Sequence, residues 1–205
     1  MSIVCSACGA WTQPVVDHEE KTACCTDCGH IEPRRFGPLF IVTGASGVGK
    51  TAVVPEVQRL LPDWDVFETD ILWDSGGDWS MVKCNWLRIA HSLMQSRRPV
   101  ILCGSIKPAD LNQCETRPFF TTIYYLALHC EDTTLGERLR ARPAWRGWTE
   151  ELVAVHQEFQ QWFLDHASSE FEPPLALVDT TSISVEESAC QIRDWALARW
   201  HLEQG

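Results

Sequence analysis

The segment Gly44-Ala45-Ser46-Gly47-Val48-Gly49-Lys50-Thr51 follows the apolar run from Leu39 to Val42 after a single residue, Thr43. Its spacing, G-x-x-x-x-G-K-T, is that of a phosphate-binding loop, in which successive backbone N–H groups form a concavity for phosphate oxygens. We expect Lys50 to reach the β- and γ-phosphates of a nucleoside triphosphate and Thr51 to give its hydroxyl to Mg²⁺. A helix that starts near Gly49 would add its positive dipole end. The stretch therefore predicts a triphosphate site between a strand and a helix.

The composition is that of a globular protein, with 45% hydrophobic and 22% charged residues among 205. The net charge of −11 disfavours a general affinity for nucleic acid, because such binding normally needs a clustered Lys/Arg surface. The sequence shows neither a signal-peptide pattern nor an apolar run long enough to span a membrane. We therefore expect a cytoplasmic protein without a membrane partner.

Five of the ten cysteines lie in the first 28 residues, where Cys5-x-x-Cys8-Gly9 and Cys25-x-x-Cys28-Gly29 repeat one pattern sixteen residues apart. Two such turns can complete a tetrahedral site of four thiolates, so we expect Cys5, Cys8, Cys25 and Cys28 to bind a structural Zn²⁺ in a zinc ribbon. Cys24 is expected to be a spare thiol. His18 and His30 are alternative ligands, and a redox pair is the alternative function, although neither C-x-x-C lies beside a βαβ pattern.

The other cysteines are scattered through apolar or helical segments and are expected to be small buried hydrophobes. They are Cys84, Cys103, Cys114, Cys130 and Cys190. The segment from Glu32 to Pro38 contains two prolines and a glycine and is predicted to be a linker. We therefore expect a zinc ribbon over residues 1–36 and a second domain over residues 37–205.

Strand and helix patterns alternate through the second domain. Strands are expected at 39–42, 65–69, 99–103, 122–129 and 175–179, and helices at 50–61, 80–95, 133–142, 150–166 and after the capping box Ser184-x-x-Glu187. This alternation predicts an α/β fold with a five-stranded parallel sheet flanked by helices. Asp70 would stand just past the carboxyl end of the second strand, at the edge where such sheets collect ligands.

From Gly37 onward the chain resembles the small P-loop kinases of metabolites and nucleotides. These include shikimate, gluconate and nucleoside-monophosphate kinases and chloramphenicol phosphotransferase. The resemblance rests on the phosphate loop, on Asp70, on the arginine-rich stretch 137–143 and on the turn Val178-Asp179-Thr180-Thr181. It implies that Asp70 binds or deprotonates an acceptor hydroxyl; the alternative roles are a strand-end cap or an outer-sphere Mg²⁺ ligand.

The same resemblance implies a lid over ATP and an adenine-contacting turn. Arg138, Arg142 and Arg146 would be lid cations, and Asp179 and Thr180 would lie against the adenine. Phosphoryl transfer needs charge neutralisation and in-line positioning, which Lys50, Mg²⁺ and lid arginines would supply. The expected function is an ATP- and Mg²⁺-dependent phosphotransferase that acts on a small metabolite, most simply a nucleoside or nucleotide.

Two departures from this pattern keep another class of function open. The third strand ends in Cys103-Gly104-Ser105, without the acid that often helps to hold Mg²⁺, and the run from Leu175 to Asp179 also fits a Walker-B pattern. The alternative is therefore a regulatory or interaction ATPase whose zinc ribbon docks a partner or nucleic acid. However, Thr180 stands where such ATPases usually carry a water-activating glutamate.

The acceptor side is predicted only in outline. Trp73 and Trp79, on either side of an Asp- and Gly-rich loop, could stack on a base or sugar, and Arg88 or Lys83 could bind an acceptor phosphate. Zinc ribbons often bind nucleic acid, and this one carries two cations, Arg34 and Arg35, at its C-terminal end. A polynucleotide or tRNA acceptor is therefore a further alternative, which the acidic net charge disfavours.

Overall fold

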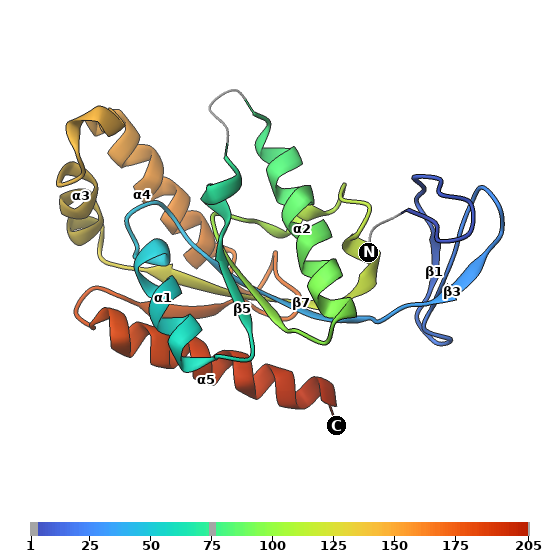
Figure 1. Cartoon of the computed structure of the whole chain (residues 1–205). Coiled ribbons are helices and arrows are strands. Elements are labelled where there is room, and N and C mark those ends of the chain that lie inside the picture. The colour runs from blue at the N-terminus through green and yellow to red at the C-terminus, as the bar shows by residue number, and fades with distance from the viewer. Residues whose placement is uncertain (1–3, 74–76, 205) are drawn as a thin grey trace.

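The computed structural model describes residues 4–73 and 77–204, and it contains a five-stranded, all-parallel sheet with the order β5-β6-β4-β7-β8. Its strands are β4 (Gly37–Thr43), β5 (Asp65–Glu68), β6 (Val100–Cys103), β7 (Phe120–His129) and β8 (Ala176–Asp179). Helices cover both faces of this sheet (Figure 1). The predicted α/β class and strand count are confirmed.

Five α-helices accompany the strands, namely α1 (Lys50–Leu60), α2 (Trp79–Gln95), α3 (Asp132–Arg140), α4 (Glu150–Asp165) and α5 (Val185–Gln204). Helix α1 continues through Pro55. The Ser184 hydroxyl accepts a hydrogen bond from the Glu187 N–H, and the Glu187 carboxylate accepts one from the Ser184 N–H, so the expected capping box forms. Within the described residues, no helix combines the length and hydropathy that a membrane span requires.

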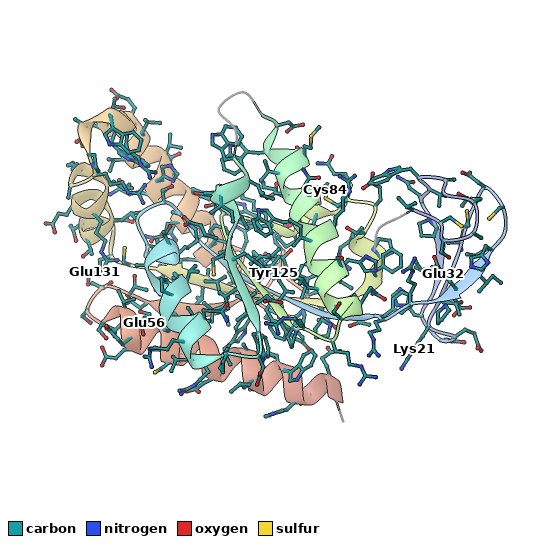
Figure 2. All side chains as sticks on the ribbon, viewed as in Figure 1. Lys21, Glu32, Glu56, Cys84, Tyr125 and Glu131 are labelled. Atoms are coloured by element: carbon teal, nitrogen blue, oxygen red, sulfur yellow. A yellow bond between two sulfur atoms is a disulfide. The ribbon has the colours of Figure 1, made fainter. Side chains whose placement is uncertain are left out.

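The N-terminal residues form a separate three-stranded antiparallel sheet of β1 (Val15–Asp17), β2 (Thr22–Cys24) and β3 (Ile31–Pro33). This small sheet, on which Lys21 and Glu32 are labelled in Figure 2, lies at the opposite end of the molecule from α3 and α4. Phe36 stacks on Phe119 with ring centroids 5.7 Å apart, so the chain between the two sheets packs against the segment that leads into β7. The division near residue 36 stays a prediction.

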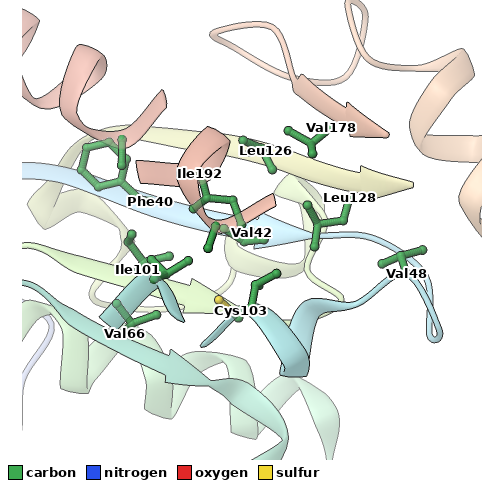
Figure 3. Packing of buried hydrophobic residues seen from close by; sticks show 14 of the residues in the cluster. Phe40, Val42, Val48, Val66, Ile101, Cys103, Leu126, Leu128, Val178 and Ile192 are labelled. Atoms are coloured by element: carbon green, nitrogen blue, oxygen red, sulfur yellow. The ribbon is translucent and has the colours of Figure 1, made fainter. Parts of the chain in front are cut away.

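Alternate residues of β4 point into two separate cores. Phe40 and Val42 pack with residues of α1 and α5, whereas Leu39 and Ile41 pack with residues of α2. Figure 3 shows the first core, in which Ile192 of α5 lies over Val42. Because both faces of the strand are covered, β4 reads as a continuous apolar run, as buried parallel strands do. The phosphate loop thus starts from the middle strand of the sheet.

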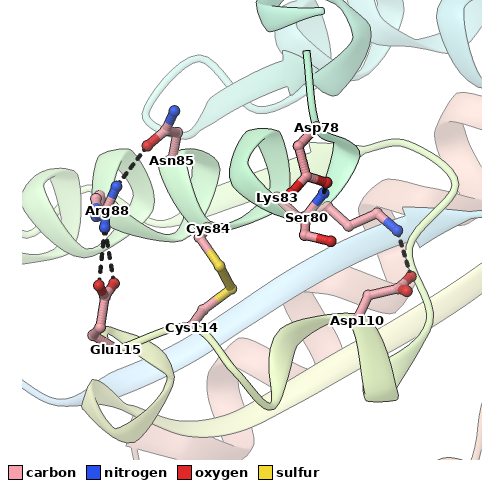
Figure 4. Close-up of a disulfide and its surroundings, with 9 residues drawn as sticks. All are labelled: Asp78, Ser80, Lys83, Cys84, Asn85, Arg88, Asp110, Cys114 and Glu115. Carbon is pink, nitrogen blue, oxygen red and sulfur yellow. Dashed lines mark hydrogen bonds and ion pairs between the residues drawn. A yellow bond between two sulfur atoms is a disulfide. The ribbon is translucent and has the colours of Figure 1, made fainter.

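Two cysteines expected to be isolated are in fact bonded to each other. Cys84 of α2 and Cys114 form a disulfide with Cα atoms 5.0 Å apart (Figure 4). Cys103 and Cys130 are buried free thiols, as expected, while Cys190 is half-buried. The prediction was wrong for the first pair because a separation of 30 residues gives no local signal that two side chains meet.

Candidate functional site

The phosphate loop Gly44–Thr51 joins the end of β4 to the start of α1, as the motif predicts. Gly44 has φ +133°, and a Cβ atom there would lie 2.4 Å from the Leu128 carbonyl oxygen. Gly47 has φ +94°, and its Cβ would meet Leu135 of α3 at 2.9 Å. Both positions therefore exclude any side chain, which lets the loop lie flat against β7 and α3.

Lys50 folds back over the phosphate loop. Its ammonium group donates to the carbonyl oxygens of Gly44 at 2.8 Å and Ala45 at 2.7 Å. Burial lowers the pKa of Lys50 to about 8, while the negative charges of Asp70 and Glu68 act in the opposite direction. Lys50 therefore lies within electrostatic reach of two carboxylates at the carboxyl edge of the sheet.

Thr51 contacts an acid that the sequence analysis did not single out. The Thr51 hydroxyl donates to the carboxylate of Glu68, the last residue of β5. This contact brings together two side chains with oxygen atoms that can bind a metal, one in the first turn of α1 and one at the end of β5. Oxygen donors are what Mg²⁺ prefers, so these two side chains fit a magnesium site beside the phosphate loop. The available signal was the position of Glu68 directly after the apolar pair Val66-Phe67.

Asp70 lies in the 3₁₀ helix η1 (Thr69–Leu72), immediately past β5, and is exposed. The buried indole of Trp86 donates from Nε1 to the Thr69 carbonyl oxygen at 2.8 Å, so it fixes the turn that carries Asp70. Gly104 packs directly against Thr69 of this turn, because a Cβ atom at position 104 would fall 1.8 Å from the Thr69 hydroxyl oxygen. Trp86 is thus a buried packing residue that also supports this turn.

The end of β6 contributes no carboxylate, as the sequence suggested. The Ser105 hydroxyl instead donates to the Gly44 carbonyl oxygen at 2.8 Å and so supports the phosphate loop. Cys103 is buried, and burial raises the pKa of its thiol to about 12, which keeps it neutral. The acid nearest the loop threonine therefore comes from β5 rather than from β6.

The three expected lid arginines have different surroundings. Arg138 of α3 is half-buried and donates to the Thr180 hydroxyl at 3.1 Å and to the Thr180 carbonyl at 2.7 Å. Arg142 lies over the Trp148 ring at 5.2 Å, and Arg146 lies over Trp145 at 5.0 Å. Arg138 therefore ties α3 to the β8–α5 turn, while the other two guanidinium groups are stacked on indoles.

Arg142 is electrostatically linked to the site. Burial lowers the pKa of Arg142, and so does the charge of Arg146, whereas the charge of Asp70 raises it. The negative charge of Asp70 therefore acts on both Lys50 and Arg142. The structure brings these three predicted residues together with the phosphate loop.

Asp179 and Thr180 lie at the end of β8, an edge strand separated from β4 by β7. The Asp179 carboxylate accepts from the Thr181 N–H at 2.8 Å and from its hydroxyl, and these bonds lower the pKa of Asp179. The buried Thr180 hydroxyl reaches the Val48 carbonyl of the phosphate loop at 3.0 Å. Asp179 therefore caps its own turn, an arrangement that gives no support to a Walker-B role.

His156 of α4 is a second residue that the sequence analysis missed. Its Nδ1 accepts a hydrogen bond from the Ser46 N–H of the phosphate loop at 3.4 Å. Burial and then the charges of Lys50 and Arg142 lower the pKa of His156, which favours the neutral imidazole that this acceptor role requires. The 110 residues between Ser46 and His156 explain why no motif contains the pair.

On the side of the proposed acceptor, Trp73 and Trp79 stack on each other with centroids 4.1 Å apart and ring planes 8° from parallel. Both indoles are partly exposed, and the loop residues 74–76 between them lie outside the described residues. Lys83 pairs with Asp110 at 2.7 Å, and Arg88 binds Glu115 (Figure 4). The two cations suggested for an acceptor phosphate are therefore neutralised by their own carboxylates.

The four expected metal ligands converge at the other end of the molecule. The sulfur atoms of Cys5, Cys8, Cys25 and Cys28 all lie within 4.8 Å of one another. The two knuckles are alike, because the Gly9 N–H donates to the Cys5 carbonyl and the Gly29 N–H donates to the Cys25 carbonyl, both at 2.9 Å. In this part of the described chain neither His18, His30 nor Cys24 joins the cluster. This donor set is that of a closed structural zinc site.

Comparison with protein-family models and with curated protein sequences finds no match. Among solved structures, a gluconokinase from Sinorhizobium meliloti 1021 superposes with a TM-score of 0.55 at 19% identity, covering 82% of this chain and 96% of that one. A putative kinase from Chloroflexus aurantiacus superposes with a TM-score of 0.54 at 17% identity, covering 80% of this chain and 98% of that one. A deoxyadenosine kinase from M. mycoides with bound dATP superposes with a TM-score of 0.50 at 14% identity, covering 80% of this chain and 100% of that one. The chain therefore has the fold of the P-loop kinases.

Proposed function

We propose that this protein is an ATP- and Mg²⁺-dependent phosphotransferase that moves the γ-phosphate to a hydroxyl or phosphate of a small, nucleoside- or nucleotide-like metabolite. The observation that carries the proposal is the place of Asp70, whose charge acts on both Lys50 and Arg142 beside the phosphate loop. A carboxylate facing two phosphate-binding cations can hold an acceptor hydroxyl against the γ-phosphate. Such positioning, with charge neutralisation, is the main need of phosphoryl transfer.

On the donor side, the phosphates of ATP would replace the contacts that Lys50 makes with Gly44 and Ala45. Arg142 and Arg146 lie on the loop between α3 and α4, so a small movement of that loop would bring their guanidinium groups to the γ-phosphate. Arg138 would act indirectly, by holding Thr180 beside the phosphate loop. Closure of this lid would exclude water and limit wasteful hydrolysis.

Thr51 and Glu68 would hold Mg²⁺, directly or through water. The metal, when bound, neutralises charge on the phosphate oxygens. Zn²⁺ would occupy the four-cysteine cluster and supply the folding free energy of a small module, on the order of 10–16 kcal/mol for structural zinc.

The acceptor is proposed to lie against the Trp73–Trp79 pair. These stacked indoles follow Asp70 within the same connection between β5 and α2, and an aromatic face suits a base or sugar. The deoxyadenosine kinase with bound dATP shows that a protein of this fold can hold a nucleotide. A nucleoside or nucleotide therefore fits this side best.

The test is transfer of label from [γ-³²P]ATP to pools of nucleosides, nucleotides, sugars and hydroxy acids. We expect a labelled product in one pool, and Asp70→Asn should lower its rate by about 10²- to 10⁴-fold while ATP still binds. Asp63→Asn, which changes an exposed aspartate before β5, is the matched control and should leave the rate unchanged. Tight ATP binding with slow hydrolysis and no transfer to any pool would instead support the regulatory ATPase.

A further inference from the structure

A cavity of about 690 Å³ lies between the N-terminal module and the larger sheet. Its walls come from the β1–β2 turn, from residues 34–39, from the end of α2 and from the end of α5, with the first residues of β6 and β7. These are the amino ends of the parallel strands. The phosphate loop lies at the other end of β4, roughly 20 Å away at about 3.3 Å per residue. The cavity is therefore distinct from the proposed ATP site.

The lining of this cavity is strongly basic in a chain whose net charge is −11. Its cations are Lys21, Arg34, Arg35, Arg97 and Arg98, and Glu203 is the acid among the residues that line it. Arg34 pairs with Glu32 and Arg98 pairs with Asp65. Glu203 accepts a hydrogen bond from the Tyr124 hydroxyl at 2.8 Å.

Three of the lining cations lack such partners. Among the described residues, none forms an ion pair or a side-chain hydrogen bond with the charged groups of Lys21, Arg35 or Arg97. The Arg35 backbone is nevertheless fixed, because its N–H and its carbonyl both bond to the Gln95 side chain at 3.0 Å. Three cations without a charged partner among the described residues therefore line one cavity.

Two of these cations occupy left-handed backbone, where a long side chain is unfavourable. Lys21 has φ 53° and Arg97 has φ 63°, and they are the two non-glycine residues with positive φ in the described chain. Arg97 ends α2 in a Schellman arrangement, with its N–H on Met94 and the Arg98 N–H on Leu93, and glycine is usual at that position. Strained residues tend to gather at functional sites. Here both line the same cavity.

The rest of the cavity is apolar and aromatic. Phe36, Met94, Phe120 and Trp200 line it together with Leu39 and Val100. A volume of this size, an apolar wall and several charged groups in the lining are features of a small-molecule site. Extended polyanions are a poorer match, because the rest of this acidic protein would repel them.

We propose that this cavity binds a small phosphorylated molecule with an apolar or aromatic portion. The phosphate contacts Lys21, Arg35 and Arg97, and the apolar portion lies against Phe36 and Trp200. Charge-assisted hydrogen bonds to phosphate supply the affinity, and the aromatic wall selects against bare inorganic anions. This inference does not depend on the proposed phosphotransferase activity, since it uses no residue of the phosphate loop.

The experiment is isothermal titration calorimetry of the full chain with inorganic pyrophosphate, AMP and adenosine. Lys21→Asn and Arg97→Gly remove each cation and place a residue that tolerates left-handed backbone. The free energy of unfolding should therefore stay equal or rise, so that lost binding is not lost folding. Arg59→Gln, on the exposed face of α1, is the matched control. Lys50→Ala removes the phosphate-loop cation and so separates the two sites.

We expect AMP to bind the Lys50→Ala protein, adenosine to bind at least tenfold more weakly, and each cavity variant to weaken AMP binding roughly tenfold or more. Arg59→Gln should bind like the unchanged protein. Loss of all AMP and pyrophosphate binding in Lys50→Ala would overturn the proposal, as would unchanged binding in Lys21→Asn and Arg97→Gly. It would also fail if a single-stranded oligonucleotide bound through these cations while AMP did not.

Discussion

The Thr51 hydroxyl at the start of α1 donates a hydrogen bond to the carboxylate of Glu68 at the end of β5. This contact joins the phosphate loop to the strand that leads directly into Asp70. It also compensates for the absence of an acid at the end of β6, where Ser105 supports the loop through the Gly44 carbonyl. The proposed metal site and the proposed acceptor residue are therefore positioned by one short segment, Glu68 to Asp70.

Glu68→Gln should weaken the use of Mg²⁺ without preventing the fold. An amide is a poorer partner than a carboxylate for a hard dication, so the Mg²⁺ concentration that gives half-maximal transfer should rise about 10- to 100-fold. Activity measured against Mg²⁺ at saturating ATP tests this. Glu56→Gln alters a half-buried acid on α1 that pairs with Arg59, and it should leave the Mg²⁺ dependence unchanged. Identical Mg²⁺ curves for Glu68→Gln and the unchanged protein would remove Glu68 from the metal site.

Gly104→Ala should displace the turn that carries Asp70. The added Cβ would fall 1.8 Å from the Thr69 hydroxyl oxygen and 2.9 Å from its Cβ, so Thr69 must move. We expect a loss of about 1–3 kcal/mol in the free energy of unfolding, as for overpacked cores, together with reduced transfer. Urea unfolding measures the first effect. Adding Thr69→Ala should restore part of the stability, and a lack of coupling between the two substitutions would contradict the steric explanation.

The cysteine cluster predicts which thiols matter for metal content. Cys28→Ser should abolish the roughly one equivalent of zinc per chain expected for a single four-thiolate site. Cys24→Ser is the matched control, because the Cys24 sulfur lies outside the cluster and contacts the Cys25 carbonyl oxygen. Elemental analysis of purified protein provides the measurement. A full zinc equivalent in Cys28→Ser, or an ordered N-terminal module without metal in the unchanged protein, would refute the assignment.

The strands and helices of the larger sheet could be predicted from the sequence because each of them carries a strong local signal. The run from Leu39 to Val42 is apolar on both faces, and the expected helix at 150–166 is capped by Thr149, whose hydroxyl accepts from the Leu152 N–H. The three short strands of the N-terminal module were not predicted. Each spans only three residues, which is too short for their alternation of more and less exposed side chains to be recognised in the sequence.

The parts of the candidate site that escaped prediction are contacts between distant segments. His156 meets Ser46 across 110 residues, and Arg138 meets Thr180 across 42. Neither pair belongs to a spacing pattern, because their proximity results from α3 and α4 packing beside the phosphate loop. Motifs identify which residues can bind phosphate, whereas tertiary packing decides which of them are free to do so.

The Cys84–Cys114 disulfide should stabilise the contact between α2 and the loop before β7. It closes a loop of 30 residues, for which the chain-entropy model gives about 3–4 kcal/mol. Cys84→Ser should lower the free energy of unfolding by that amount under oxidising conditions and have little effect in the presence of a reductant. Cys190→Ser alters a half-buried free thiol and serves as the control. Equal stability of the Cys84→Ser and unchanged proteins without reductant would show that the bond does not form.

His91 of α2 should make the protein less stable in mild acid. Its ring is buried against Phe119 with centroids 4.2 Å apart, and neither ring nitrogen has a hydrogen-bond partner within the described chain. Burial lowers the pKa of His91 from 6.5 to about 4, so the folded protein holds this ring neutral. Between these two values the unfolded chain binds a proton that the folded chain does not, and stability therefore falls as the pH decreases.

The shift corresponds to about 3 kcal/mol lost between pH 7 and pH 4, in addition to the loss from carboxylates. His91→Leu removes this contribution, so its free energy of unfolding should decline less steeply over that range, whatever its value at pH 7. Urea unfolding of both proteins at several pH values gives the two slopes. Parallel slopes would mean that His91 is protonated, or reaches water, in the folded protein.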